Sequence, residues 1–251
     1  MSLQPPASVD DLGLQGALNL WALLTGQERR LPITPTARMT LTVMDLLRQQ
    51  RIIEVPWPSA SWGLIPEAQH TPLEDLQWRL AWKVYDPPQL LAALEDYLGN
   101  IPKDDLGMAI RLRLWIELGA GEAEHFFASQ LEKHGLPTEW AQDIAFVYQT
   151  HKHRLSFAHW RYCAWAAVRK GASLAMRGFS SSEQLREAIY QELRHRASAV
   201  ASGAWTQCSL PPFHPTPPSA LARGFIHLLS PLGMAYWTTC PSLDALAEAG
   251  R

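Results

Sequence analysis

Three histidines lie close together in the middle of the chain: His151, His153 and His159. Imidazoles bind a metal ion only where their ring nitrogens converge on one point. On a single helix His151 and His159 share a face, whereas His153 points about 160° away from His151. A metal site would therefore need a carboxylate from another helix, and we predict neither a metal site nor a cofactor.

The segment 154–159 reads Arg-Leu-Ser-Phe-Ala-His, with Arg154 five residues before His159. It fits the pattern Arg-x(4–6)-His and resembles the motif of the helical ribonucleases of the HEPN superfamily. In that family the motif lies on a helix, usually at a dimer interface, and cleavage uses the RNA 2′-hydroxyl without a metal ion. The resemblance covers these six residues, and Leu155 stands where the family usually has a polar residue. It implies Arg154 and His159 as catalytic candidates of a ribonuclease.

Other catalytic patterns are missing from the sequence. It contains no Gly-x-x-x-x-Gly-Lys phosphate loop, no Gly-x-Ser-x-Gly nucleophile turn and no His-Glu-x-x-His. Gly119 and Gly121 begin a dinucleotide-type pattern, but the third glycine is replaced by Glu124. We therefore expect the chain to be non-enzymatic.

Basic residues concentrate in one part of the chain. Residues 151–200 hold nine Lys or Arg against three Glu, a net charge of +6, whereas residues 51–150 hold seven basic and fifteen acidic residues, a net charge of −8. Such a basic segment is able to bind nucleic-acid phosphates, to contact the acidic part of the same chain, or to mediate dimerisation. The nucleic-acid-binding candidates are Lys152, Arg154, Arg161, Arg169, Lys170, Arg177, Arg194 and Arg196.

Five aromatic side chains are interleaved with these cations and would be able to stack on bases. They are Phe157, Trp160, Tyr162, Trp165 and Tyr190. Helical aromatics more often belong to a core, and the spacing of the segment places Trp160 on an inward stripe. The stripe comprises Phe157, Trp160, Ala164, Ala167, Gly171 and Leu174, whose small residues allow a second helix to approach closely.

The composition is that of a folded protein. The chain has 251 residues, a net charge of −2, and 47% hydrophobic residues, which excludes a disordered chain and a globally basic nucleic-acid coat. Its three cysteines lie far apart in the sequence and do not form a disulfide framework. The first residues carry no basic signal region, and the uncharged stretch 224–243 is interrupted by prolines. We expect a cytoplasmic protein that does not enter a membrane.

Proline positions and apolar spacing predict a mainly α fold, a multi-helix bundle. No proline falls between Thr138 and Leu210, which favours long helices there, and the proline-rich segment 211–218 reads as a connector. We predict a first helix that Gly26 closes, and a second helix capped by Thr36 with Met39, Val43, Leu46 and Leu47 inward. The predicted helices cover 12–25, 36–51, 72–85, 88–98, 103–118, 121–134, 138–150, 154–177, 181–201, 219–229 and 242–249, with one short strand at 52–55.

These elements predict three parts of the chain. Residues 1–66 form an N-terminal helical segment whose order of helix, helix and strand is winged-helix-like. Residues 67–210 form a helical core domain, and residues 211–251 form the connector and C-terminal helices packed on that core. One formal charge, Arg223, falls within 197–243, so we expect part of this stretch to be covered.

The sequence favours a non-enzymatic helical protein that acts through protein–protein contacts, as a regulator, a complex subunit or a neutralising partner. Its partner is another protein or a second copy of the chain, and the 11 tryptophans suit such an interface. The alternative is a nucleic-acid-binding regulator or complex subunit that uses the basic helices of 151–200. The second alternative is the HEPN-like ribonuclease.

Overall fold

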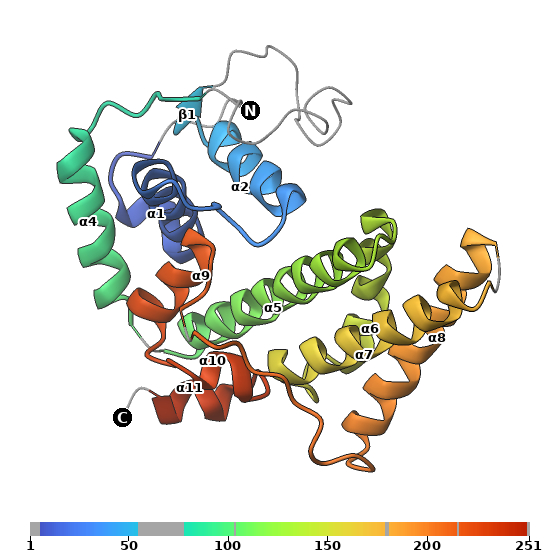
Figure 1. Ribbon diagram of the computed structural model, residues 1–251. Coiled ribbons are helices and arrows are strands. Elements are labelled where there is room, and N and C mark those ends of the chain that lie inside the picture. The colour runs from blue at the N-terminus through green and yellow to red at the C-terminus, as the bar shows by residue number, and fades with distance from the viewer. Residues whose placement is uncertain (1–5, 55–77, 103, 179–180, 215, 250–251) are drawn as a thin grey trace. The chain divides into compact units, whose positions relative to one another are not determined.

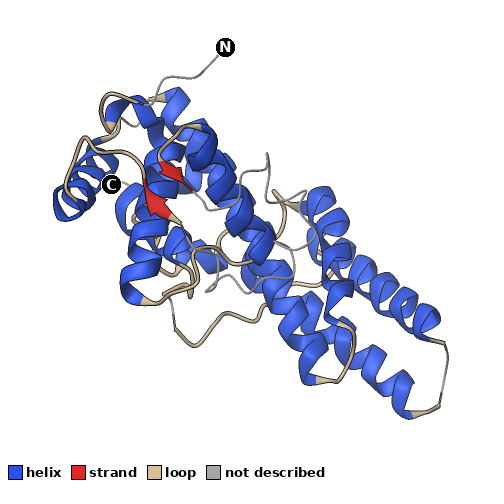
Figure 2. Cartoon of the chain, turned by 90° about the horizontal axis from the view of Figure 1, so that it is seen from above, coloured by secondary structure: helices blue, strands red, loops and turns tan. Residues whose placement is uncertain are grey.

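The computed structural model describes residues 6–54, 78–102, 104–178, 181–214 and 216–249. Helices dominate these residues, which confirms the mainly α prediction (Figure 2). The chain divides into two compact units. Unit 1 comprises residues 1–111 and 216–231, and unit 2 comprises residues 112–215 and 232–251. The boundary expected after residue 66 lies outside the described residues, and the segment 211–251 is shared between both units.

Unit 1 is built around helix α1 (Gly13–Arg29), which follows a 3-10 turn η1 (Asp10–Leu12). Leu18, Leu20 and Leu23 of α1 are fully buried. Helices α4 (Pro87–Asn100) and α9 (Ala220–Gly224) lie against α1, with α2 (Ala37–Gln49) nearby (Figure 1). A π-helical turn, η5 (Phe225–Leu229), continues α9, so the single helix predicted over 219–229 is two short elements.

The second helix starts where the sequence predicts, because the Thr36 side chain accepts a hydrogen bond from the backbone N–H of Met39. Its inward face differs from the prediction. Leu46 is 38% exposed, and Thr40 is buried with its hydroxyl 2.8 Å from that of Thr34. Helix α1 also runs past Gly26 to Arg29, and it ends where Arg30 takes a left-handed conformation and donates its backbone N–H to the Gly26 carbonyl.

A two-stranded antiparallel pair lies in unit 1. Strand β1 (Ile53–Glu54) confirms the predicted strand over its described residues, and it pairs with β2 (Arg79–Leu80) in the register Ile53 to Leu80. The helix predicted over 72–85 is wrong for residues 78–85, which are non-helical. Trp82 follows β2, is buried, and donates its indole N–H to the Pro6 carbonyl, so this segment is held by tertiary contacts.

Unit 2 contains the long helix α5 (Asp105–Lys133), whose first turns belong to unit 1, together with α6 (Ile144–His151), α7 (Phe157–Met176) and α8 (Ser182–Ala201). The 3-10 turn η4 (Thr138–Asp143) replaces the start of the helix predicted over 138–150. Short helices α10 (Ala235–Thr238) and α11 (Leu243–Ala249) complete the unit. Trp160 is fully buried as predicted, with its ring 5.1 Å from that of Tyr148.

The helices predicted over 103–118 and 121–134 are one helix, α5. Gly119 and Gly121 do not break it. A Cβ at Gly119 would collide with the ring of Phe157 and the hydroxyl of Tyr148, so glycine here permits the close approach of α7 and α6. Sequence alone does not separate a glycine that ends a helix from one that lets a neighbour approach.

Candidate functional site

The predicted basic segment forms two antiparallel helices, α7 and α8, in unit 2 (Figure 1). Ser156 caps α7 in a reciprocal box with His159, and Ser181 caps α8 in the same way with Gln184. The two helices approach closely at Gly171, where a Cβ would collide with the Ile189 side chain. Phe157, Trp160, Ala164, Ala167 and Gly171 of the predicted stripe are buried, and Leu174 is half-buried.

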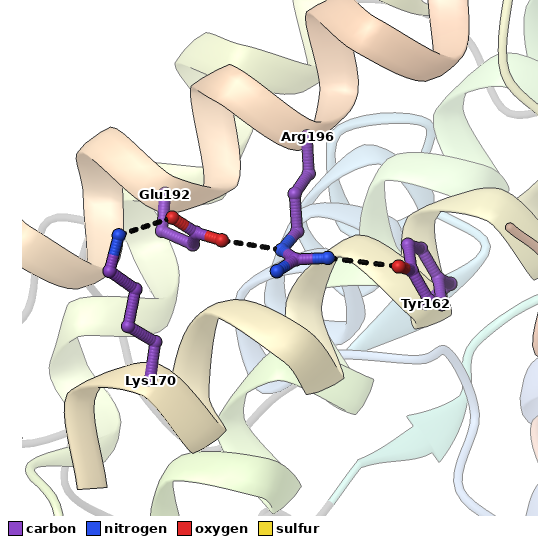
Figure 3. A network of polar contacts seen from close by, with 4 residues as sticks. All are labelled: Tyr162, Lys170, Glu192 and Arg196. Carbon is purple, nitrogen blue, oxygen red and sulfur yellow. Dashed lines mark hydrogen bonds and ion pairs between the residues drawn. The ribbon is translucent and has the colours of Figure 1, made fainter. Parts of the chain in front are cut away.

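Glu192 of α8 lies between two cations of the predicted site (Figure 3). Its carboxylate accepts hydrogen bonds from Lys170 Nζ at 2.6 Å and from Arg196 Nε at 2.7 Å. Burial of Glu192 acts to raise its pKa, but the hydrogen bonds from Lys170 and Arg196 outweigh it and hold the pKa below its usual value. The same Arg196 donates from Nη1 to the Tyr162 hydroxyl at 2.9 Å.

Arg196 also belongs to a row of cations and aromatic rings. Its guanidinium lies 5.3 Å from the ring of Trp205 and 5.7 Å from that of Tyr162. The Tyr162 ring is 6.2 Å from the ring of Trp165, over which the guanidinium of Arg169 lies at 4.8 Å. We call Trp205, Arg196, Tyr162, Trp165 and Arg169 the cation–aromatic row.

Arg161 is half-buried and turned toward the chain's own backbone. Its Nε donates to the Leu210 carbonyl at 3.0 Å, and its guanidinium lies 4.1 Å from the centre of the Phe126 ring. Leu210 in turn donates its backbone N–H to the Ala158 carbonyl of α7 at 2.8 Å. Leu210 is thereby held against the first turns of α7. Other residues of the weakly charged C-terminal stretch, among them Leu221, Phe225 and Tyr236, are buried, so part of that stretch is covered, as predicted.

The remaining nucleic-acid-binding candidates lie at the surface. Arg154, Arg169, Arg177 and Arg194 are exposed and Lys152 is half-buried; none of these five makes an ion pair within the described part of the chain. Arg194 covers the ring of Tyr190 at 5.3 Å, as Arg169 covers that of Trp165. The eight candidates therefore differ in what their side chains contact. Arg161, Lys170 and Arg196 bind groups of their own chain, and two others cover aromatic rings.

The two catalytic candidates do not share a helix. Arg154 lies in the turn between α6 and α7, with its backbone N–H bonded to the His151 carbonyl, and its side chain is exposed. His159 lies in the first turn of α7, and its Nδ1 is 3.0 Å from the Ser156 hydroxyl within the capping box. Burial of His159 lowers its pKa. The placement of Arg154 departs from the HEPN motif, which lies on a helix.

A buried carboxylate that is not among the predicted site residues lies on α5. Glu122 is 6% exposed, and no group of the described residues donates a hydrogen bond to its Oε1. Burial raises the pKa of Glu122 to about 7, against the opposing effect of the positive charge of Arg161. Asp143 is an acidic residue that does bind a basic helix of unit 2, since it accepts two hydrogen bonds of 2.7 Å from Arg186 of α8.

No protein-family model, curated protein or solved structure matches this chain. Within the described residues, no helix is long and apolar enough to cross a membrane. No group of three or more His, Cys, Asp or Glu side chains gathers in a geometry for a metal ion in that same part of the chain.

Proposed function

We propose that this chain is a non-enzymatic helical protein that acts by binding another protein, as a regulator, a complex subunit or a neutralising partner. The observation that carries the proposal is the outward placement of large apolar side chains on helices of unit 2. Phe146 of α6 is 74% exposed and Met176 of α7 is 89% exposed. Burying such side chains against a partner removes apolar surface from water, which is the main driving force of protein association.

The use of the basic side chains supports a protein partner over nucleic acid. A phosphate-binding surface needs cations that are free to contact the backbone, and a stacking surface needs open aromatic faces. Arg161, Lys170 and Arg196 instead bind a carbonyl, a carboxylate and a hydroxyl of the same chain. The rings of Trp165 and Tyr190 are each covered by an arginine of their own helix.

Nucleic-acid binding is the second candidate. Arg154, Arg177 and Lys152 favour it, because these side chains have no carboxylate partner in the described part of the chain. In unit 1 the order α1, α2, β1, β2 favours a winged-helix-like segment, since β2 supplies the second strand that such a fold needs. The HEPN-like ribonuclease with Arg154 and His159 stays a prediction.

Photo-cross-linking from α6 tests the proposed function. A photoreactive phenylalanine analogue replaces Phe146 in the full chain, and the matched control replaces Gln149, which is exposed on the same helix. In cell extract we expect protein adducts from position 146 in at least several-fold excess over position 149. The absorbance ratio at 260 and 280 nm of the purified chain is measured before and after a high-salt wash. Absence of protein adducts, together with nucleic acid that is lost at high salt, would replace this proposal with the second candidate.

A further inference from the structure

One face of α7 is covered along its first turns and open along its last turns. Leu210 contacts this face at Ala158 and Arg161 through backbone and side-chain hydrogen bonds. Beyond it the same face continues through Trp165, Arg169, Ala172 and Met176, because residues spaced by four, seven and eleven positions lie within a narrow arc of a helix. We call these four residues the open strip of α7.

The open strip combines an apolar and a cationic part. Trp165 and Ala172 are half-buried, and Met176 is 89% exposed. Arg169 is exposed, lies 4.8 Å over the Trp165 ring, and has no carboxylate partner in the described residues. A guanidinium stacked on an aromatic ring keeps its planar edge of N–H donors directed outward, which is the geometry that a carboxylate accepts in two parallel hydrogen bonds.

The charged residues of α7 determine which kind of partner segment suits the open strip. Helix α7 contains no Asp or Glu, and Arg177 follows directly at its C-terminal end. Lys170 is neutralised by Glu192, and Arg161 is turned toward Leu210, so the cation that faces outward from the strip is Arg169. Complementarity requires an acidic group opposite Arg169 and an aliphatic group opposite Met176. The two residues are seven positions apart, which is about 10 Å along a helix.

We propose that the open strip of α7 binds an acidic segment of a partner protein, in which an aliphatic side chain follows a carboxylate at about 10 Å. The inference rests on the proposed function, that the chain binds another protein. In an extended segment of polyproline II conformation the required separation is three residues, because each residue advances about 3.1 Å and side chains three residues apart lie on the same face. Leu210, which is non-helical, shows that the first turns of α7 already bind extended backbone at one residue.

Fluorescence anisotropy with two labelled peptides tests this inference on the full chain. The probe repeats Glu-Glu-Ser-Leu five times, and its counterpart repeats Lys-Lys-Ser-Leu. We expect the acidic peptide to bind and the basic peptide not to bind. Arg169→Ala is expected to weaken binding at least ten-fold, and Met176→Ser to weaken it several-fold. The matched control is Arg194→Ala, which also removes an exposed arginine stacked on a ring and should stay within two-fold of the unchanged chain.

Circular dichroism melts confirm that each variant is folded, as expected for substitutions at three exposed positions. Equal binding by Arg169→Ala and Arg194→Ala, or no binding of the acidic peptide, would overturn the inference. The proposed function is tested by a different experiment, the photo-cross-linking from position 146. Protein adducts from position 146 with no peptide binding at the strip would leave the proposed function in place and remove only this surface. Preference for the basic peptide would likewise overturn the inference.

Discussion

At Glu122 a carboxyl group is buried with one oxygen that receives no hydrogen bond from the described residues. The positive charge of Arg161 of α7 acts on it, while Tyr236 of α10 and Tyr148 of α6 lie in the same buried region. The carboxylate form is therefore poorly stabilised in the folded chain. The protonated form, which is uncharged, suits this site better.

The titration of Glu122 should be visible in the pH dependence of the free energy of unfolding. Because burial raises the pKa of Glu122 to about 7 in the folded chain, its favourable contribution is complete below the unfolded pKa and is lost as the pH rises through 7. A rise of this size corresponds to roughly 3 kcal/mol. Glu122→Gln mimics the protonated form, so we expect the variant to be more stable than the unchanged chain at pH 8.5 and similar at pH 5.

Urea denaturation at pH 5, 7 and 8.5 measures this difference. The Gln variant is the necessary comparison, because burial lowers the pKa of His125 and His159, whose contributions change in the opposite direction as the pH falls. Those contributions are common to both chains and cancel in the difference. Parallel stability profiles of the two chains would show that Glu122 is ionised in the fold at neutral pH.

At the scale of elements, two glycines let helices of unit 2 approach one another. Gly119 of α5 faces Phe157 and Tyr148, and Gly171 of α7 faces Ile189. The Cβ positions at both sites are occupied by neighbouring side chains. A methyl group there would push apart helices that share one core.

Alanine substitutions separate packing from helix propensity. We expect Gly119→Ala to reduce the free energy of unfolding by about 1–3 kcal/mol, because a rigid aromatic ring occupies the space. Gly171→Ala should reduce it less, since the Ile189 side chain is able to change rotamer. The control is Gly99→Ala in α4, where a Cβ meets nothing within 4 Å and where alanine should stabilise the helix by roughly 0.5–1 kcal/mol. Thermal denaturation followed by circular dichroism checks all three, and stabilisation at Gly119 would contradict this packing.

The elements differ in how far the sequence predicts them. The cap at Thr36 and the buried stripe of α7 follow from local spacing, because capping and helical periodicity depend on residues within a few turns. Strand β2 is two residues long, and its hydrogen bonds come from β1, so no local pattern marks it. Glu122 was a surface-type residue by composition, and only the tertiary placement of α7 and α10 makes it buried. The eight basic candidates were found by charge, but the partner of each depends on packing.

At the scale of the whole molecule, the acidic and basic parts of the sequence meet inside unit 2. Arg186 pairs with Asp143, and Arg161 influences the buried Glu122. The excess positive charge of 151–200 thus serves in part to hold this unit together. Its exposed remainder, which includes Arg169 and Arg177, is free of carboxylates within the described residues.

Charge-reversal variants should distinguish the cations that stabilise unit 2 from the exposed cations. Arg161→Glu places a carboxylate beside Glu122 and removes the hydrogen bond to Leu210, so we expect the melting temperature to fall by several degrees, an effect of about 1–3 kcal/mol. The double reversal of Arg169 and Arg177 should leave the melting temperature nearly unchanged. Anisotropy with a labelled 20-nucleotide RNA should show little binding by the unchanged chain. Tight, salt-sensitive RNA binding that disappears in the folded double variant would favour the nucleic-acid candidate.

The division of the chain into two units also determines when unit 1 is able to complete its folding during synthesis. Residues 216–231, which include α9, belong to unit 1, although the whole of 112–215 is translated before them. Gly224 of α9 packs against the Trp21 ring of α1, where a Cβ would lie 2.7 Å from a ring carbon. During translation this apolar side of α1 therefore stays uncovered until residues 216–231 have emerged from the ribosome. Nascent chains arrested before residue 216 should expose Trp21 to chaperones, while chains released past 231 should not.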